Sequence, residues 1–342
     1  MKVLLTGLGP ISDKIYSHKA AQAIIYADQL KHAGLDVTIN LASKKITDYT
    51  PFDEVYVYHG SDWSGNLNLF GGIENYQNIE TVGALSRFNG EVKSLIIDFP
   101  QYSDMFEARL KKANMSFDWD WQNLRKIEKQ AKTVDPNLVK RYDRISIGDS
   151  HAICMYRPGW MNVSTPFKTL HGAIKLGFDH FIPEGSYKEI EIYFGNIDVR
   201  HHLCRNDDVK KAAKDLADRY TAAAEFLADK HSAKVTLWEL LPIEDPSRKV
   251  PKTGNYKGTP FYGSWQERTD ARQYFMDELE SSDVPVFKWV DKLKNKKGEL
   301  DFEFMEKPQS IHLSRASYPH WQGKEWTEVK KEEGVQLDAF MV

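Results

Sequence analysis

Hydrophobic and polar positions in the first third of the chain form short apolar runs that alternate with one amphipathic block and one weaker helical pattern. The apolar runs predict strands at 1–6, 35–41, 54–58 and 92–98. The block at 18–33 has helical spacing and ends before Gly34, a residue typical of a helix C-terminus. A second helix is predicted at 78–88. Strands that alternate with helices favour a parallel sheet covered by helices.

A second series of the same kind follows a polar segment at 116–143, which is mostly helical in pattern and broken by Asp135-Pro136. Strands are predicted at 144–148, 190–194, 235–241 and 284–290, and helices at 207–230 and 268–279. The chain is therefore predicted to be an α/β protein with two consecutive Rossmann/flavodoxin-like parallel-sheet domains. The domains are expected at 1–115 and 144–342, with 116–143 as a helical linker.

Composition narrows the class of protein further. The 342 residues carry a net charge of -3, so no global basic field indicates a nucleic-acid partner. Two cysteines are too few for a disulfide framework. The first residues, MKVLLTGLGP, lack the long apolar region of a signal peptide, and no run approaches about 20 apolar residues. These features predict a cytoplasmic protein with no membrane partner.

Ligands of parallel sheets bind beyond the carboxyl ends of the strands, which places the loops 7–12 and 60–72 at a functional edge. Gly7-Leu8-Gly9 begins like a dinucleotide fingerprint, but Ser12 occupies the position of the third glycine. A tight turn is the favoured interpretation, and no cofactor is predicted.

The motif with the clearest chemistry is Ile147-Gly148-Asp149-Ser150-His151, at the end of the strand predicted at 144–148. A serine there lies on the turn from strand to helix, and its Oγ is expected to face the ligand crevice. Neighbouring amides at the helix N-terminus would stabilise an oxyanion. Gly-Asp-Ser alone also fits an ordinary turn, so the motif needs support from the rest of the chain.

Two later motifs supply that support. Phe194-Gly195-Asn196-Ile197-Asp198-Val199-Arg200 follows a strand, and Ser310-Ile311-His312-Leu313-Ser314 comes near the end of the domain. The order of serine, Gly-Asn and late histidine resembles that of the SGNH (GDSL-like) hydrolases over about residues 144–318. GDSH and GNIDVR are most similar to a branch with Gly-Glu-Ile-Asp-Cys-Arg in its middle block, often linked to polysaccharide or glycan modification.

The resemblance implies a serine esterase or acyl transferase that acts on an O-acylated small molecule or glycan. Ser150 would be the nucleophile and His312 the base that accepts its proton. Asp149 and Asp198 are expected to brace loops, and Arg200 to pair with one of these two acids. The groups expected to hold the oxyanion are the Ser150 amide, Gly195, the Asn196 side chain, and a further glycine, either Gly172 or Gly159.

Two departures from the family pattern affect this hypothesis. The usual Gly-x-Asn-Asp is here Gly195-Asn196-Ile197-Asp198, so the asparagine is displaced by one position. The usual Asp-x-x-His is here Gln309-Ser310-Ile311-His312, and glutamine cannot stabilise an imidazolium as a carboxylate does. Glu306 or Asp301 would be the substitutes if the loop folds back on the histidine.

Two alternatives remain open. The N-terminal third, with FDEVYVYHGS and NLFGG, is similar to the acceptor half of phage DNA glucosyltransferases. A two-domain glycosyltransferase would bind a nucleotide sugar and use Asp62 as its base, with modified DNA as one acceptor. The other alternative is a non-catalytic binding protein on the SGNH scaffold. His201 and Cys204 have no second ligand pair at convincing spacing, so no metal is predicted, and Cys154 is interpreted as a core residue.

Overall fold

The computed structural model describes residues 1–7, 18–40, 48–58, 82–95, 97, 103–165, 168–247, 258, 261–306 and 310–320. The described residues divide into two compact units, one within 1–138 and the other within 139–320. The loops predicted to be functional at 8–12 and 60–72, Asp62, and Gln309 lie outside the described residues.

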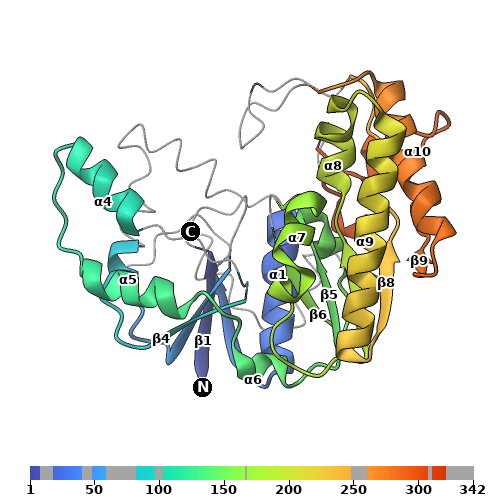
Figure 1. Cartoon of the computed structure of the whole chain (residues 1–342). Helices are drawn as coiled ribbons and strands as arrows, with labels where there is room; N and C mark the ends of the chain where they lie inside the picture. Colours follow the sequence, from blue (N-terminus) through green and yellow to red (C-terminus); the bar gives the residue numbers. More distant parts are fainter. Residues whose placement is uncertain are drawn as a thin grey trace. The chain divides into compact units, whose positions relative to one another are not determined.

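The first unit contains a four-stranded parallel sheet in the order β2-β1-β3-β4 (Figure 1). Its strands are β1 (Lys2–Gly7), β2 (Asp36–Asn40), β3 (Glu54–Tyr58) and β4 (Glu91–Ser94). Helix α1 (His18–His32) connects β1 to β2, as the sequence pattern predicts. Helices α4 (Ser103–Lys112), α5 (Trp121–Gln130) and the short α6 (Pro136–Val139) follow the sheet.

The segment 116–143 is predicted to be a helical linker between the domains. In the structure, most of it packs within the first unit. Leu124, Ile127 and Ala131 lie on one side of α5 and its C-terminal end, and belong to the same buried cluster as Val55 and Val57 of β3. α5 begins after Asp120, whose side chain caps it by accepting a hydrogen bond from the Asn123 amide. The unit boundary falls instead within α6.

The second unit contains a five-stranded parallel sheet in the order β6-β5-β7-β8-β9, which is the flavodoxin-like order. Its strands are β5 (Arg144–Gly148), β6 (Met161–Ser164), β7 (Glu189–Tyr193), β8 (Lys234–Trp238) and β9 (Val286–Phe287). The two parallel sheets confirm the prediction of two α/β domains. β6 is an unpredicted strand, and β9 covers only two of the residues predicted at 284–290.

Helices of the second unit are α7 (Leu170–Leu176), α8 (Asn196–His201), α9 (Val209–His231) and α10 (Trp265–Ser281). α9 packs beside α10 and against β8 (Figure 1). α10 begins earlier than predicted because Ser264 and Glu267 form a capping box, in which each side chain bonds the other residue's amide. α9 begins after Asp208, whose side chain accepts from the Lys211 amide.

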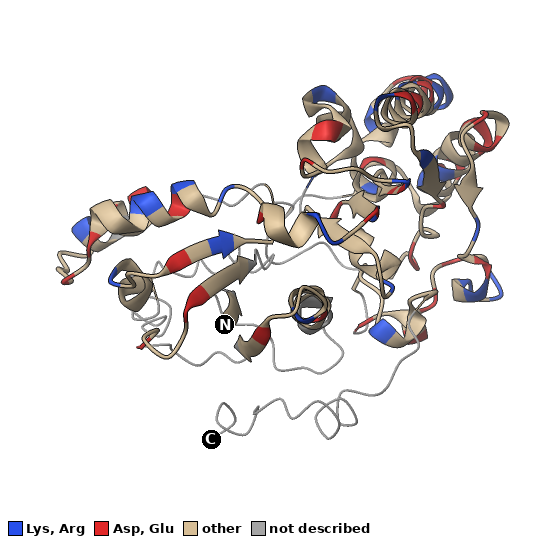
Figure 2. Ribbon diagram, turned by 90° about the horizontal axis from the view of Figure 1, so that it is seen from below, with Lys and Arg blue, Asp and Glu red and all other residues tan. Residues whose placement is uncertain are grey.

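Lysine and arginine are interspersed with acidic residues along the described ribbon and are not segregated by sign (Figure 2). This distribution agrees with the small net charge of the chain. None of the described helices is both long enough and apolar enough to cross a membrane.

Candidate active site

Ser150 stands two residues after the end of β5, in the first turn of the 3₁₀ helix η2 (Ser150–Met155). Gly148 ends the strand at a place where a side chain would not fit, because an added Cβ would lie 2.3 Å from the carbonyl oxygen of Tyr193. Asp149 caps η2 by accepting a hydrogen bond from the His151 amide at 2.8 Å. The Gly-Asp-Ser sequence thus allows a close strand approach and a capped turn that together fix the position of Ser150.

His312 is placed beside Ser150 by a fold-back of the chain near the end of the unit. Met305 and Leu313 form an antiparallel bridge, and the Glu306 amide donates to the carbonyl oxygen of His312 at 3.0 Å. The Oγ of Ser150 lies 2.9 Å from Nε2 of His312. The structure therefore joins the two residues that the sequence proposed as nucleophile and base, across 162 positions of chain.

Glu306 lies on the other side of the His312 ring. Its Oε1 is 3.8 Å from Nδ1 of His312 and accepts a hydrogen bond from the Ser310 hydroxyl at 2.9 Å. The Ser310 hydroxyl also accepts from the His312 amide at 3.1 Å. Asp301, the other possible substitute, caps the 3₁₀ helix η6 (Phe302–Phe304) by accepting from the Glu303 amide.

His151 is a site residue to which the sequence analysis gave no role. Its Nδ1 lies 2.9 Å from Oδ1 of Asp149, and its ring centroid is 5.0 Å from that of His312. Burial lowers the pKa of His151, while the Asp149 carboxylate opposes that shift. The only signal in the sequence was its position next to Ser150, where a tight turn brings consecutive side chains to one site.

The three residues expected to hold the oxyanion together with the Ser150 amide differ from one another in their hydrogen bonds. The Gly172 amide donates to Thr169 Oγ1 at 3.0 Å and so belongs to the cap of α7. Gly195 adopts a positive φ of 116° and forms the N-cap of α8, a conformation that favours glycine. The Asn196 Oδ1 accepts from the Leu241 amide at 3.1 Å. Its buried Nδ2 has no hydrogen-bond partner within the described ranges, so it remains a candidate donor.

Arg200 does not pair with Asp149 or Asp198, so that expectation is wrong. Its Nε lies 2.8 Å from Oε2 of Glu244, and both side chains are 1% exposed. Nη1 also donates to the Asn196 carbonyl oxygen at 3.1 Å. Arg200 thus ties the start of α8 to Glu244, in the chain beyond β8.

Asp198 joins two helices at the edge of the site. Its Oδ2 accepts from the Leu170 amide at 2.7 Å and its Oδ1 from the His171 amide at 3.2 Å, both at the start of α7. Burial raises the pKa of Asp198 to about 6, although these amide hydrogen bonds act in the opposite direction.

The raised pKa predicts a pH dependence of stability. Folded Asp198 holds its proton more tightly than the unfolded chain, so its contribution is complete below about pH 4 and is lost as the pH rises through about 6. A shift of about two pH units corresponds to about 3 kcal/mol. We expect Asp198→Asn to remove this fall, as measured by urea unfolding at pH 4 to 7. The readout is the pH slope, because asparagine leaves one of the two amides without an acceptor. An unchanged slope in the variant would contradict the assignment.

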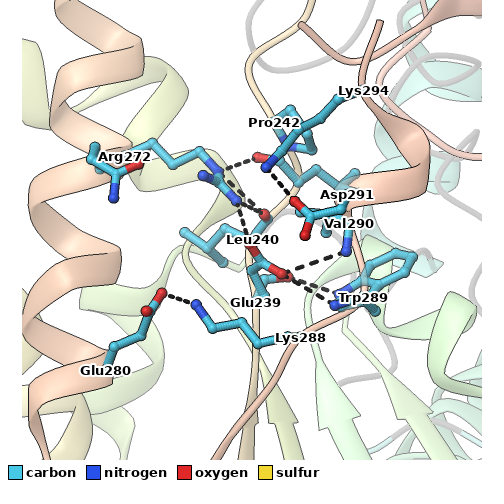
Figure 3. Close-up of polar contacts among 12 residues, drawn as sticks. Glu239, Leu240, Pro242, Arg272, Glu280, Lys288, Trp289, Val290, Asp291 and Lys294 are labelled. Atoms are coloured by element: carbon cyan, nitrogen blue, oxygen red, sulfur yellow. Dashed lines mark hydrogen bonds and ion pairs between the residues drawn. The ribbon is translucent and has the colours of Figure 1, made fainter. Parts of the chain in front are cut away.

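A second buried ion pair anchors the chain that leads to His312 (Figure 3). Arg272 Nη2 lies 3.2 Å from Glu239 Oε1, and Arg272 Nε donates to the Leu241 carbonyl oxygen at 2.8 Å. The other Glu239 oxygen accepts from the amides of Trp289 (3.1 Å) and Val290 (3.4 Å). The end of β8, α10 and the segment after β9 are thereby held together, and this segment continues toward the catalytic histidine candidate.

Cysteine and metal chemistry have little support within the described ranges. Burial raises the pKa of the Cys154 thiol, which disfavours a thiolate nucleophile there. In the described part of the chain, no three or more His, Cys, Asp or Glu residues are grouped so that they could hold a metal ion.

Neither a protein-family model nor a curated protein matches the chain. Among solved structures, a protein from Streptococcus pneumonia provisionally described as a platelet activating factor is 16% identical, with 60% of this chain and 86% of that chain covered and a TM-score of 0.39. A provisionally described acylhydrolase from Bacteroides fragilis NCTC 9343 is 12% identical, with 60% of this chain and 90% of that chain covered and a TM-score of 0.37. A gut microbial diltiazem-metabolizing enzyme is 13% identical, with 47% of this chain and 39% of that chain covered and a TM-score of 0.29. These values are too low to assign a family or an activity to this chain.

Proposed function

We propose that the chain is a serine esterase or acyl transferase of the SGNH-like type, acting on an O-acylated small molecule or glycan. The observation that carries the proposal is the 2.9 Å distance between Ser150 Oγ and His312 Nε2. A serine hydroxyl is a weak nucleophile unless a base within hydrogen-bond distance takes its proton. The two residues come from opposite ends of the unit, and this pairing supplies that base.

The proposed reaction has two steps. Ser150 Oγ bonds to the ester carbonyl carbon while His312 Nε2 accepts the hydroxyl proton, and the negative charge collects on the carbonyl oxygen. The ester C–O bond then breaks, the leaving alkoxide takes the proton from His312, and the acyl group remains on Ser150. Water, or an acceptor hydroxyl, then attacks the acyl carbon as His312 removes its proton. The bond between that carbon and Ser150 Oγ breaks, Ser150 takes the proton back from His312, and the acid or the new ester leaves.

The proposal is tested by intact-mass analysis after treatment with a fluorophosphonate probe. We expect one adduct on the wild-type protein and none on Ser150→Ala, because only a serine activated by a base is phosphonylated at a useful rate. Ser247→Ala, which removes an exposed serine of the same unit, is the matched control and should retain the adduct.

A folded wild-type protein that takes up no adduct would overturn the proposal and direct attention to nucleotide-sugar binding. An adduct that persists in Ser150→Ala would place the nucleophile elsewhere. Once Ser150 is labelled, O-acetylated sugars and short acyl esters are the substrates to compare.

A further inference from the structure

We infer that Glu306 supplies the carboxylate that orients and stabilises His312, and that Ser310 holds this carboxylate in place. The inference rests on the proposed function of Ser150 and His312. It assigns a positioning role to two residues, neither of which occupies the usual aspartate position, which is Gln309 in this chain.

Glu306 is on the correct side of the imidazole for this role. Nε2 of His312 faces Ser150 at 2.9 Å, and Nδ1, the other ring nitrogen, is 3.8 Å from Glu306 Oε1. The carboxylate therefore lies opposite the nucleophile, as the acid does in a serine–histidine–acid triad. The Glu306 side chain is only 11% exposed, so water screens its charge weakly.

Ser310 explains how a glutamate six positions before the histidine is held beside it. The Ser310 hydroxyl donates to Glu306 Oε1 at 2.9 Å and accepts from the His312 amide at 3.1 Å. The Glu306 amide donates to the His312 carbonyl oxygen, so backbone and side chain close the same loop. A charged acceptor makes the hydroxyl bond to the carboxylate a strong one.

The other acids near the site are occupied differently. Asp149 Oδ1 accepts from both the amide and Nδ1 of His151, and Asp301 Oδ1 accepts from the Glu303 amide. When His312 takes the Ser150 proton, its positive charge forms 3.8 Å from the Glu306 carboxylate. The proton that His312 already holds on Nδ1 stays there, and Glu306 remains ionised throughout the step.

The experiment measures the second-order rate of fluorophosphonate labelling at one fixed pH for the wild type and Glu306→Gln. We expect the rate to fall roughly 100-fold, which is less than the roughly 10⁴-fold effect of the directly bonded aspartate in the protease example.

Three variants separate positioning from folding. Glu306→Asp keeps the carboxylate and should restore part of the rate, and Ser310→Ala should lower the rate by a smaller amount than Glu306→Gln. Glu303→Gln changes an exposed glutamate of the same segment and should behave as the wild type. Thermal unfolding of each variant shows whether it is folded.

The failures of the two proposals are distinguishable. If Ser150 is labelled and Glu306→Gln keeps the wild-type rate, the role of Glu306 is wrong and the proposed function stands. If folded Glu306→Asp is as slow as folded Glu306→Gln, the carboxylate itself does not act on His312, and the inference is again wrong. If the wild type is not labelled at all, both fail together.

Discussion

Replacing His312 by glutamine is expected to lower the turnover of p-nitrophenyl acetate by about 10⁴-fold or more, since loss of the base leaves Ser150 as an ordinary hydroxyl. The 2.9 Å contact between Ser150 and His312 is the basis of this expectation. Glutamine nearly fills the space of the ring and can accept a hydrogen bond, but it cannot take a proton. The measurement is kcat and kcat/KM at pH 7 to 8, with Ser150→Ala as the reference for complete loss.

Two comparisons make the result specific to the base. His320→Gln removes another histidine of the same C-terminal segment, one whose ring packs on Trp238 and Phe287, and it should keep most of the rate. His312→Ala should recover part of its activity with added imidazole. A rate for His312→Gln within tenfold of the wild type would mean that His312 is not the base.

The fold of this chain was largely predictable because parallel sheets buried on both faces need nearly continuous apolar strands. β5 and β7 match their predicted positions to within one residue. β6 was missed because its four buried residues, Met161–Ser164, include two polar ones. Asn162 fits there because its Nδ2 donates to Ser146 Oγ and to the Ala152 carbonyl oxygen, neither of which can be inferred from local pattern.

The site was predictable only in part, because contacts between distant parts of the chain cannot be inferred from the local sequence pattern. Ser150 and His312 stand in motifs whose order along the chain could be compared with a family pattern. The partners of the charged residues could not be found this way. Arg200 pairs with Glu244, 44 positions later, and Glu239 with Arg272, 33 positions later, because the ends of adjacent strands and helices meet in space. Glu306 was only one of two possible acids until the bridge between Met305 and Leu313 placed it beside His312.

Breaking the pair between Arg200 and Glu244 is expected to cost more stability than any other single charge change in the site. Glu244→Gln would leave the Arg200 guanidinium, with its side chain 1% exposed, without its carboxylate. Removing one partner of a buried pair typically destabilises a protein by about 3–5 kcal/mol. Urea unfolding monitored by tryptophan fluorescence and circular dichroism measures this loss as a change in the midpoint at constant slope.

Burial, rather than the ion pair itself, is what makes this effect large, and two further variants test that reasoning. Arg144 and Glu189 form a pair of similar length, 2.9 Å, with side chains 47% and 35% exposed, so Glu189→Gln should cost about 0–1 kcal/mol. The double variant Arg200→Met with Glu244→Leu removes both charges and should be more stable than Glu244→Gln alone, because no unpaired charge stays buried. If Glu244→Gln costs no more than Glu189→Gln, Arg200 must reach solvent or another acid, and its buried position between α8 and the end of β8 would be wrong.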